Sequence, residues 1–528
     1  MSRPAARTLA TAGLAITVAF FAARLLGWVR LVIISNLFGA EADLDAYFAA
    51  FRIPDAIFQL VAAGALSSAL IPILSGLLAQ DLEEHAWRVV STVVNLMLLV
   101  LLSLAVVVAV AAPVIIPRIT PGFDAVGTEL TIRLSRVMLL SPVLLALGAV
   151  ATSVLNASGR FSASAVAPLL YNLAILLAAV LLAPVMGVEG LAVGVVLGSL
   201  LHLAVQLPPL LRRTGFAYDF RLDLGDPAAR QAILLMVPRA LGMAATQITF
   251  IVNTSLASGL VTGSIVVYTV AFTVLQIPIG VIGVPLGIVL LPAMSRAVAT
   301  GAAREFGGLV IRSLRLLLYV MLLLTALMMV LRRQLVTLLF DWGRFDARDI
   351  DATANTLLFF LLGLAAHSMI VVLARAFYAG QDTRTPVMAA TLSVVVNVLV
   401  SIATVGTMGL SGLALGIAVG AWVEAGVLTI LLWQRTPGLP IDALGRAGAE
   451  FALGSALAGL VALVIVRISD PLVGTDPGKL ALLIQGGLAA AAGIAIYVAY
   501  GWFLRIPELH TVLDLARSTV RRIRRSTA

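Results

Sequence analysis

The chain has 528 residues, of which 61% are hydrophobic and 12% are charged, with a formal net charge of +9 and no cysteine. A soluble chain averages about 45–50% apolar and about 25% charged residues, so a large soluble enzyme is excluded. The lack of cysteine excludes disulfides, thiolate metal sites and cysteine nucleophiles. Of the 35 basic residues all but Lys479 are Arg, and most lie between apolar runs. This pattern is typical of membrane orientation and not of nucleic-acid binding.

Fourteen apolar segments are predicted to cross the membrane as α-helices, because lipid accepts only helices or closed barrels and these runs are too long for barrel strands. They lie near residues 9–35, 46–79, 89–112, 130–155, 163–186, 189–211, 231–258, 265–295, 307–331, 353–379, 387–408, 410–433, 448–467 and 480–503. The first has no convincing cleavage site after it, so it is expected to be retained. Internal prolines predict bends or breaks in the second and eighth segments; they are Pro54, Pro72, Pro278, Pro285 and Pro292.

The distribution of arginine predicts the orientation. With both termini in the cytoplasm, the cytoplasmic loops carry about three times as many Arg residues as the outer loops. Loop 332–352 is then outside. The basic tail 505–528 is expected to lie against anionic lipid.

A weak repeat indicates two bundles of six helices. Leu66, Leu70, Pro72 and Ser75 recur with the same spacing 220 residues later, beginning at Leu286, and Asn172 is matched by Asn397. Six spans separate the copies, so the repeat is parallel, as in many transporters. The predicted fold is therefore an all-α integral membrane protein. Its parts are bundles 1–213 and 214–435, two added helices over 436–504, and the tail 505–528.

Charged residues inside apolar segments are costly, so they are candidates for function. The densest cluster comprises Arg24, Arg30, Asp45, Arg52 and Asp55. One interpretation is a structural or gating ion-pair network that includes Asp45 and Asp55, in which Asp45 pairs with Arg30. The other is that the guanidinium groups hold an anionic head group, since Arg binds phosphate through two parallel hydrogen bonds and stays charged.

Other candidates are more isolated. Arg239 lies within the seventh segment, where it would line a cavity or reach the interface. Asn253, Asp382, Asn397 and Glu424 are candidate oxygen ligands for a cation, or helix-packing residues. His202 and Gln206 share a helix face and favour interhelical hydrogen bonding. No metal site and no cofactor are predicted.

Motifs of enzymes are missing from the sequence: it contains no GxxxxGK[ST], no HExxH and no GxSxG. Without a nucleotide-binding loop the chain cannot bind ATP in the usual way. Transport coupled to a Na⁺ or H⁺ gradient or to the membrane potential therefore remains the hypothesis.

Several stretches resemble one transporter family. They are RLLGWVRLVIISNLFGAEADLDAYFAAFRIPD (24–55), GALSSALIPILS (64–75), LNASGRFSASAVAPLLYN (155–172), GSLLHLAVQLPPLLRR (198–213), MVPRALGMAATQITFIVNTSLASGL (236–260), LFDWGRFDARD (339–349) and ARAFYAGQDTRTPV (374–387). Together they resemble the MurJ/MviN lipid II flippase family, within the superfamily that contains drug/cation antiporters and oligosaccharide-lipid flippases. The likeness runs through the first twelve segments in order.

The resemblance implies a monomeric flippase of the bacterial inner membrane that serves peptidoglycan synthesis. It would move the undecaprenyl-pyrophosphate-linked precursor to the outer leaflet through a V-shaped central cavity, with the lipid tail beside the last two helices. Arg24, Arg30 and Asp45 match charges that function in the family.

The sequence also departs from the family. Phe58, Gln59 and Thr273 stand where the family is usually basic. Three alternatives therefore stay open: a flippase for another polyprenyl-linked oligosaccharide, a cation-coupled drug exporter, and an inactive membrane scaffold for cell-wall assembly.

Overall fold

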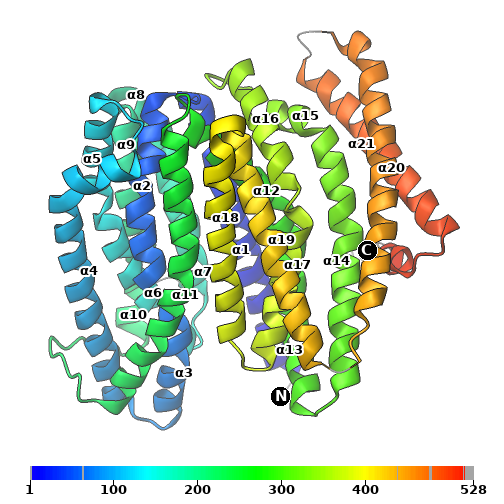
Figure 1. Ribbon diagram of the computed structural model, residues 1–528. Helices are drawn as coiled ribbons and strands as arrows, with labels where there is room; N and C mark the ends of the chain where they lie inside the picture. The colour runs from blue at the N-terminus through cyan, green and yellow to red at the C-terminus, as the bar shows by residue number, and fades with distance from the viewer. Residues whose placement is uncertain (1–2, 62–64, 437, 475–477, 515–516, 518–528) are drawn as a thin grey trace. The chain divides into compact units, whose positions relative to one another are not determined.

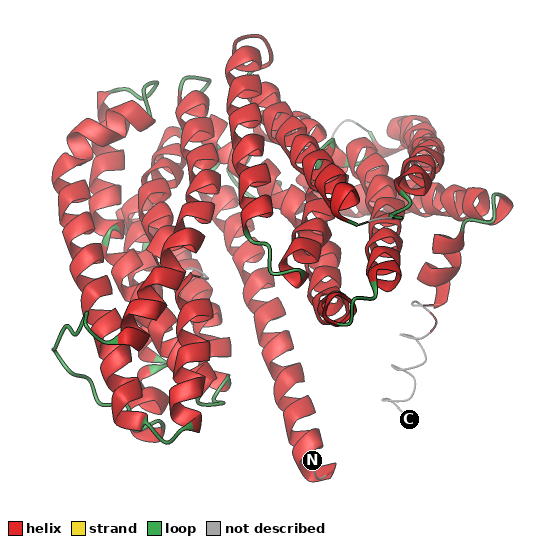
Figure 2. Cartoon of the chain, turned by 60° about the horizontal axis from the view of Figure 1, so that its bottom comes forward, coloured by secondary structure: helices red, strands yellow, loops and turns green. Residues whose placement is uncertain are grey.

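The computed structural model describes residues 3–61, 65–436, 438–474, 478–514 and 517. These residues form helices joined by short loops and turns, with no strand among them (Figures 1 and 2). Every predicted apolar segment falls on one helix or on consecutive helices, apart from residues 62–64, which lie outside the described residues.

The chain forms two compact units. The first contains Met1–Val266 and Trp342–Asp346, and the second contains Val267–Asp341 and Ala347–Ala528. The helix at 227–258, which opens the second predicted bundle, thus belongs to the first unit. It packs against the second, third and fourth helices there. The predicted boundary at 213/214 rests on a repeat in the sequence, whereas the two compact units are defined by which helices pack together.

The first unit is built from eleven described helices. They are α1 (Arg3–Phe38), α2 (Ala42–Val61), α3 (Ala65–Ala79), α4 (Glu83–Ile119), α5 (Ala125–Met138), α6 (Leu140–Ala157), α7 (Ser162–Leu181), α8 (Ala183–Met186), α9 (Val188–Ala204), α10 (Leu207–Arg213) and α11 (Pro227–Ser258). Small residues let α7 and α9 approach closely, since a Cβ at Gly194 would lie 2.4 Å from that of Ala178. A continuous apolar core joins α2, α3, α4 and α6 to the start of α11.

Segment Trp342–Asp346 packs on the end of α1. The N–H of Arg344 donates to the carbonyl of Asn36 at 2.8 Å, and the N–H of Trp342 donates to the Asn36 side chain at 2.8 Å. Gly39, with φ +72°, leaves room for this contact, because a Cβ there would lie 2.8 Å from the carbonyl oxygen of Arg344.

The second unit contains ten further described α-helices and one π-helical segment. They are α12 (Ser264–Pro278), the π-helix Ile279–Gly283, α13 (Val284–Ala299), α14 (Ala303–Val330), α15 (Arg332–Phe340), α16 (Ala347–Leu361), α17 (Leu364–Ala379), α18 (Arg384–Met408), α19 (Leu410–Arg435), α20 (Ile441–Val473) and α21 (Lys479–Phe503). Among the described helices the most extensive pairing is that of α18 with α19, and α14 packs along α20. Residues 507–514 after α21 are also helical.

Two of the three prolines of the eighth segment flank a break in its helix, as predicted, whereas Pro292 lies inside α13 without a break. Pro278 ends α12, five π-helical residues follow, and Pro285 lies in the first turn of α13. Missing N–H donors at Pro278 and Pro285 remove α-helical hydrogen bonds here, and a π-bulge accommodates the gap. In the second segment, Pro54 and Pro72 lie inside α2 and α3.

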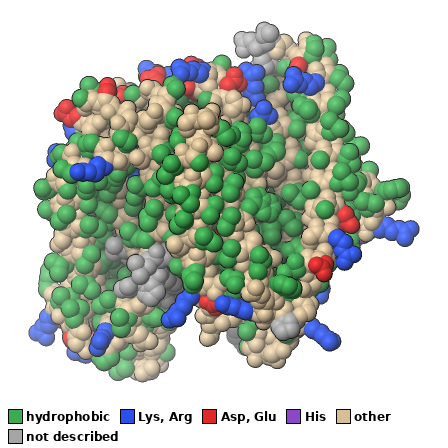
Figure 3. Space-filling view, viewed as in Figure 1, with side chains coloured by type: hydrophobic (Ala, Val, Ile, Leu, Met, Phe, Trp, Pro, Cys, Tyr) green, Lys and Arg blue, Asp and Glu red, His purple; other side chains and the backbone are tan. Residues whose placement is uncertain are grey.

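The described helices include eleven long and apolar enough to cross a membrane, or twelve if the bent pair α16 and α17 counts as one span. Fourteen spans were expected. The two segments without a candidate span among the described residues are the second and the seventh, and both include positions outside the described part of the chain: residues 62–64 between α2 and α3, and several side chains of α11. Hydrophobic side chains cover most of the visible surface, and charged ones gather mainly toward the helix ends (Figure 3).

Candidate functional site

The arginine cluster predicted from the sequence lies in the first unit, on α1 and α2. Arg24 is partly buried within α1, and among the described residues its buried Nε has no hydrogen-bond partner. A buried donor without a partner is costly, so it is a natural contact for an anion that enters the site.

Arg30 lies six residues, about 1.7 turns, further along α1 and faces α7. Its Cζ atom is 6.0 Å from the centroid of the Tyr171 ring. Arg30 and Arg52 are also the positive charges that act on the Asp55 carboxyl. The structure therefore brings α1, α2 and α7 together around one acid and two guanidinium groups.

Arg52 links α2 to α11. Its Nε donates a 3.0 Å hydrogen bond to the hydroxyl of Thr254, which is buried, and its Cζ lies 5.3 Å from the centroid of Phe250. These contacts hold the guanidinium in place, and a fixed guanidinium loses less conformational entropy when an anion binds.

Asp45 is buried and binds backbone groups. Its carboxylate accepts hydrogen bonds from the N–H of Gly263 at 2.7 Å and of Val266 at 2.8 Å. These donors lie at the start of α12, where a helix leaves its first N–H groups without intrahelical acceptors and where a carboxylate is favoured. A pair with Arg30, suggested by the sequence, stays a prediction.

The remaining candidates lie on other helices. The Arg239 side chain lies outside the described residues, and Asn253 is fully buried in α11. In the second unit, Glu424 contacts Ser393, and Asn397 lies beside Ser401.

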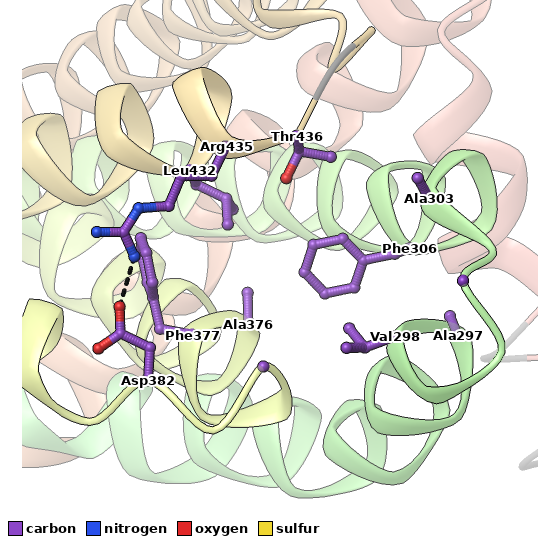
Figure 4. A pocket seen from close by; sticks show the side chains of 12 residues that line it. Ala297, Val298, Ala303, Phe306, Ala376, Phe377, Asp382, Leu432, Arg435 and Thr436 are labelled. Atoms are coloured by element: carbon purple, nitrogen blue, oxygen red, sulfur yellow. Dashed lines mark hydrogen bonds and ion pairs between the residues drawn. The ribbon is translucent and has the colours of Figure 1, made fainter.

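Asp382 holds the start of α18, far from Asn397. It accepts hydrogen bonds from the backbone N–H groups of Arg384 and Thr385 and from the Thr385 hydroxyl, and it pairs with Arg435 (Figure 4). Fifteen residues separate it from Asn397, about 22 Å along a helix. The proposed cation ligands therefore do not share one site. No group of three or more metal-binding side chains occurs among the described residues.

The structure also shows the surroundings of the three residues that differ from the family pattern. Phe58 packs against the apolar core of the first unit, and Gln59 lies beside Asp55. The Thr273 hydroxyl donates to the carbonyl of Thr269 within α12, at 2.8 Å.

Sequence reasoning missed three partners of the arginines. Tyr171, Phe250 and Thr254 belong to stretches quoted for their family likeness, but none has a charge that would single it out. It did predict the interhelical role of Gln206. The Gln206 amide donates to the carbonyl of Gly148 at 3.2 Å and accepts from Thr152 at 2.7 Å.

Comparison with known proteins identifies the fold. The chain is 23% identical to a solved "Lipid II flippase MurJ, inward closed conformation", with a TM-score of 0.79 and coverage of 93% of this chain and 99% of that one. It is also similar to an inward-facing multidrug resistance MATE family transporter of the MOP superfamily, at 18% identity and a TM-score of 0.65, covering 80% of this chain and 95% of that one.

Sequence relatives and a family model agree with the fold. The chain is 30% identical over 483 residues to a probable lipid II flippase MurJ of Rhizobium tropici, which covers 90% of each chain. It is 31% identical over 420 residues to a lipid II flippase MurJ of Burkholderia cenocepacia, which covers 78% of this chain and 81% of the relative. Residues 34–475 match the family model described as "Lipid II flippase MurJ". The chain is therefore a multi-pass membrane transporter and not an enzyme, and it belongs to the lipid II flippase MurJ family.

Proposed function

We propose that this flippase carries lipid II, the undecaprenyl-pyrophosphate-linked precursor of peptidoglycan, from the inner to the outer leaflet by alternating access. Arg24, Arg30 and Arg52 hold the pyrophosphate. Helices α20 and α21 lie beside the lipid tail. The observation that carries the proposal is the buried Nε of Arg24, which lies inside an apolar helix and has no hydrogen-bond partner in the part of the chain that the structure describes.

The chemistry of the cargo explains why arginine is suited to this site. Pyrophosphate carries several negative charges, and it leaves water when the site closes. Guanidinium groups remain charged in a medium of low dielectric constant and bind phosphate oxygens in pairs. Lysine keeps the charge but loses the paired geometry.

Complementation of a bacterium depleted of its own flippase tests the proposal. Removing one arginine that contacts the pyrophosphate costs about 2–5 kcal/mol, because the phosphate is left buried and unpaired, and transport falls at least about thirtyfold. We expect Arg24→Ala and Arg30→Ala to abolish growth and Arg24→Lys to restore part of it.

A matched control separates function from folding. Arg133 also lies in the first unit but pairs with Glu189 at 3.3 Å and is largely exposed, so Arg133→Ala is expected to support growth. All variants are quantified in the membrane. Normal growth with both Arg24→Ala and Arg30→Ala contradicts the head-group assignment, whereas loss of folded protein favours the ion-pair interpretation.

Thr273 supports a second candidate, a flippase for a different polyprenyl-linked saccharide. Its hydroxyl is engaged within its own helix and offers no charge where the family is usually basic. Thr273→Arg discriminates between the cargoes. If the variant transports lipid II faster, position 273 faces the cargo and the native chain is adapted to a different saccharide. If transport does not change, the cargo site does not use this position.

The proposed orientation places both termini in the cytoplasm of a bacterium, with the protein in the inner membrane as a monomer. Because the chain has no cysteine, single cysteines give clean labelling with an impermeant thiol reagent. Arg348→Cys, exposed in the first turn of α16, is expected to react in intact cells, and Glu84→Cys only after lysis. The opposite pattern refutes the orientation.

A further inference from the structure

The loop that joins α10 to α11, residues 214–226, lies along the first turns of α4 in the first unit (Figure 1). Phe216 packs edge-on against Trp87 with ring centroids 5.6 Å apart. At the other end of the loop, His85 hydrogen-bonds Asp226 at 2.6 Å.

Between these ends the loop climbs α4 and returns. The N–H of Asp219 donates to Ser91, and the Asn95 amide donates to the carbonyls of Asp219 and Arg221, both at 2.9 Å. The N–H of Asp223 then donates to Thr92 at 3.4 Å. The tip of the loop is therefore at residues 219–221, opposite Asn95.

Apolar and charged residues alternate along the loop in the stretch YDFRLDL (218–224). The backbone of this stretch binds α4, and the Tyr218 hydroxyl donates to the Asn95 side chain. Phe220 is 86% exposed, and the Arg221 side chain is 89% exposed. Tyr218 packs edge-on against Phe220 at 4.8 Å. A large apolar tip with this exposure needs a partner.

The exposure of α4 shows where the lipid begins. Residues 86–94 are covered apart from Arg88, whereas one face is open from Leu99 to Val114. From Leu98 to Ile119 the helix rises about 32 Å, which matches the hydrocarbon core of about 30 Å. Asn95 lies about one turn before this stretch, so the tip of the loop is level with the lipid head groups.

We propose that residues 218–222 are a membrane anchor on the side where α4 begins: Phe220 inserts at the boundary between head groups and acyl chains, and Arg221 binds an anionic phospholipid head group. The interface favours aromatic rings with apolar faces and attracts arginine. The lipid-exposed face of α4 continues directly into the tip. Arg88 in the first turns of α4 and Arg212 in α10 are also exposed. Asp219 lies 4.0 Å from the Arg221 Nε, but the Arg221 side chain is 89% exposed and can reach a head group. Lipid fits this combination better than a protein partner does.

The insertion of Phe220 is tested with an environment-sensitive fluorophore on Phe220→Cys in nanodiscs. We expect a blue-shifted emission and quenching by lipids that carry a spin label near the head group. Glu84→Cys is the matched control, since it is exposed on the same helix about 16 Å further from the hydrocarbon, and it should emit as in water. A water-like emission at 220 overturns the proposal. A blue-shifted emission at position 220 in native membranes but not in nanodiscs also overturns the proposal, and it indicates that a protein partner covers the loop.

The role of Arg221 is tested by the preference of the labelled protein for phosphatidylglycerol over phosphatidylcholine. Arg221→Gln is expected to lower this preference about fivefold. Arg133→Gln, which removes an arginine elsewhere in the same unit, should leave the label at 220 unaffected. An unchanged preference in Arg221→Gln overturns the head-group contact. Transport is not the readout, so the result is independent of the proposed cargo.

Discussion

A buried ion pair fastens the segment after α21 to α14. Glu508 accepts two hydrogen bonds from Arg315, from Nε at 2.6 Å and from Nη2 at 3.0 Å, and the two side chains are only 10% and 22% exposed. Ile506 and Leu509 are buried on either side. This arrangement predicts that Glu508→Ala strongly destabilises the second unit.

The magnitude follows from the geometry. Removing one partner of a buried pair costs about 3–5 kcal/mol, because the other charge stays buried without a counter-ion. The double variant Arg315→Ala/Glu508→Ala removes that stranded charge, so it should be less destabilised than the sum of the single variants. The free energy of unfolding is measured in mixed micelles by titration with SDS.

An exposed pair in the same unit serves as the control. Arg333 and Asp351 lie 2.9 Å apart with side chains 66% and 51% exposed, and Arg333→Ala should cost at most about 1 kcal/mol. If Glu508→Ala costs no more than Arg333→Ala, or if the single variants add, the segment is not held by this pair.

Three further predictions concern other positions. Gly263→Ala should lower the free energy of unfolding by at least about 2 kcal/mol and reduce the yield of folded protein in the membrane. The reason is that Gly263 has a φ of +88° and that a Cβ there would lie 2.0 Å from the carbonyl oxygen of Ala40. The control Gly76→Ala should change neither quantity, because a Cβ at Gly76 meets nothing within 4 Å. Burial alone raises the pKa of Asp382, but hydrogen bonds from Thr385, Arg435 and Arg384 lower it from 3.8 to about 2, so its stabilisation is complete above pH 4 and is lost as the pH falls toward 2. The melting temperatures of the native chain and Asp382→Asn should converge over that range, and a constant difference contradicts the assignment. Gly194→Leu should disrupt the contact of α7 with α9 and lower the melting temperature, whereas Gly426→Leu, in open space, should not.

The helices could be predicted from the sequence because the demand for apolar spans of fixed length is local. Hydropathy located each segment, and the prolines located the π-helical break between Pro278 and Pro285. The division into compact units could not be predicted. It depends on the packing of α11 against α2, α3 and α4, and a repeat in sequence spacing does not reveal this packing.

The site was predicted less completely than the fold. Hydropathy identified Arg24, Arg30 and Arg52 because charge in an apolar segment is conspicuous. The partners of these arginines are Tyr171, Thr254 and Phe250, which look ordinary in a helix and lie up to 202 residues away.

The bonds of Asp45 show why charge alone was an incomplete guide. A carboxylate in a sequence suggests an arginine partner, yet the start of every helix offers N–H donors that need an acceptor and carry a partial positive charge. Asp45 accepts from two of them, at Gly263 and Val266. The same need governs the loop at 214–226, whose backbone is satisfied by Ser91, Thr92 and Asn95. Where lipid excludes water, backbone N–H and C=O groups need hydrogen-bond partners as much as side chains do. The partner of a buried charge therefore has to be sought among backbone groups as well as among side chains of opposite charge.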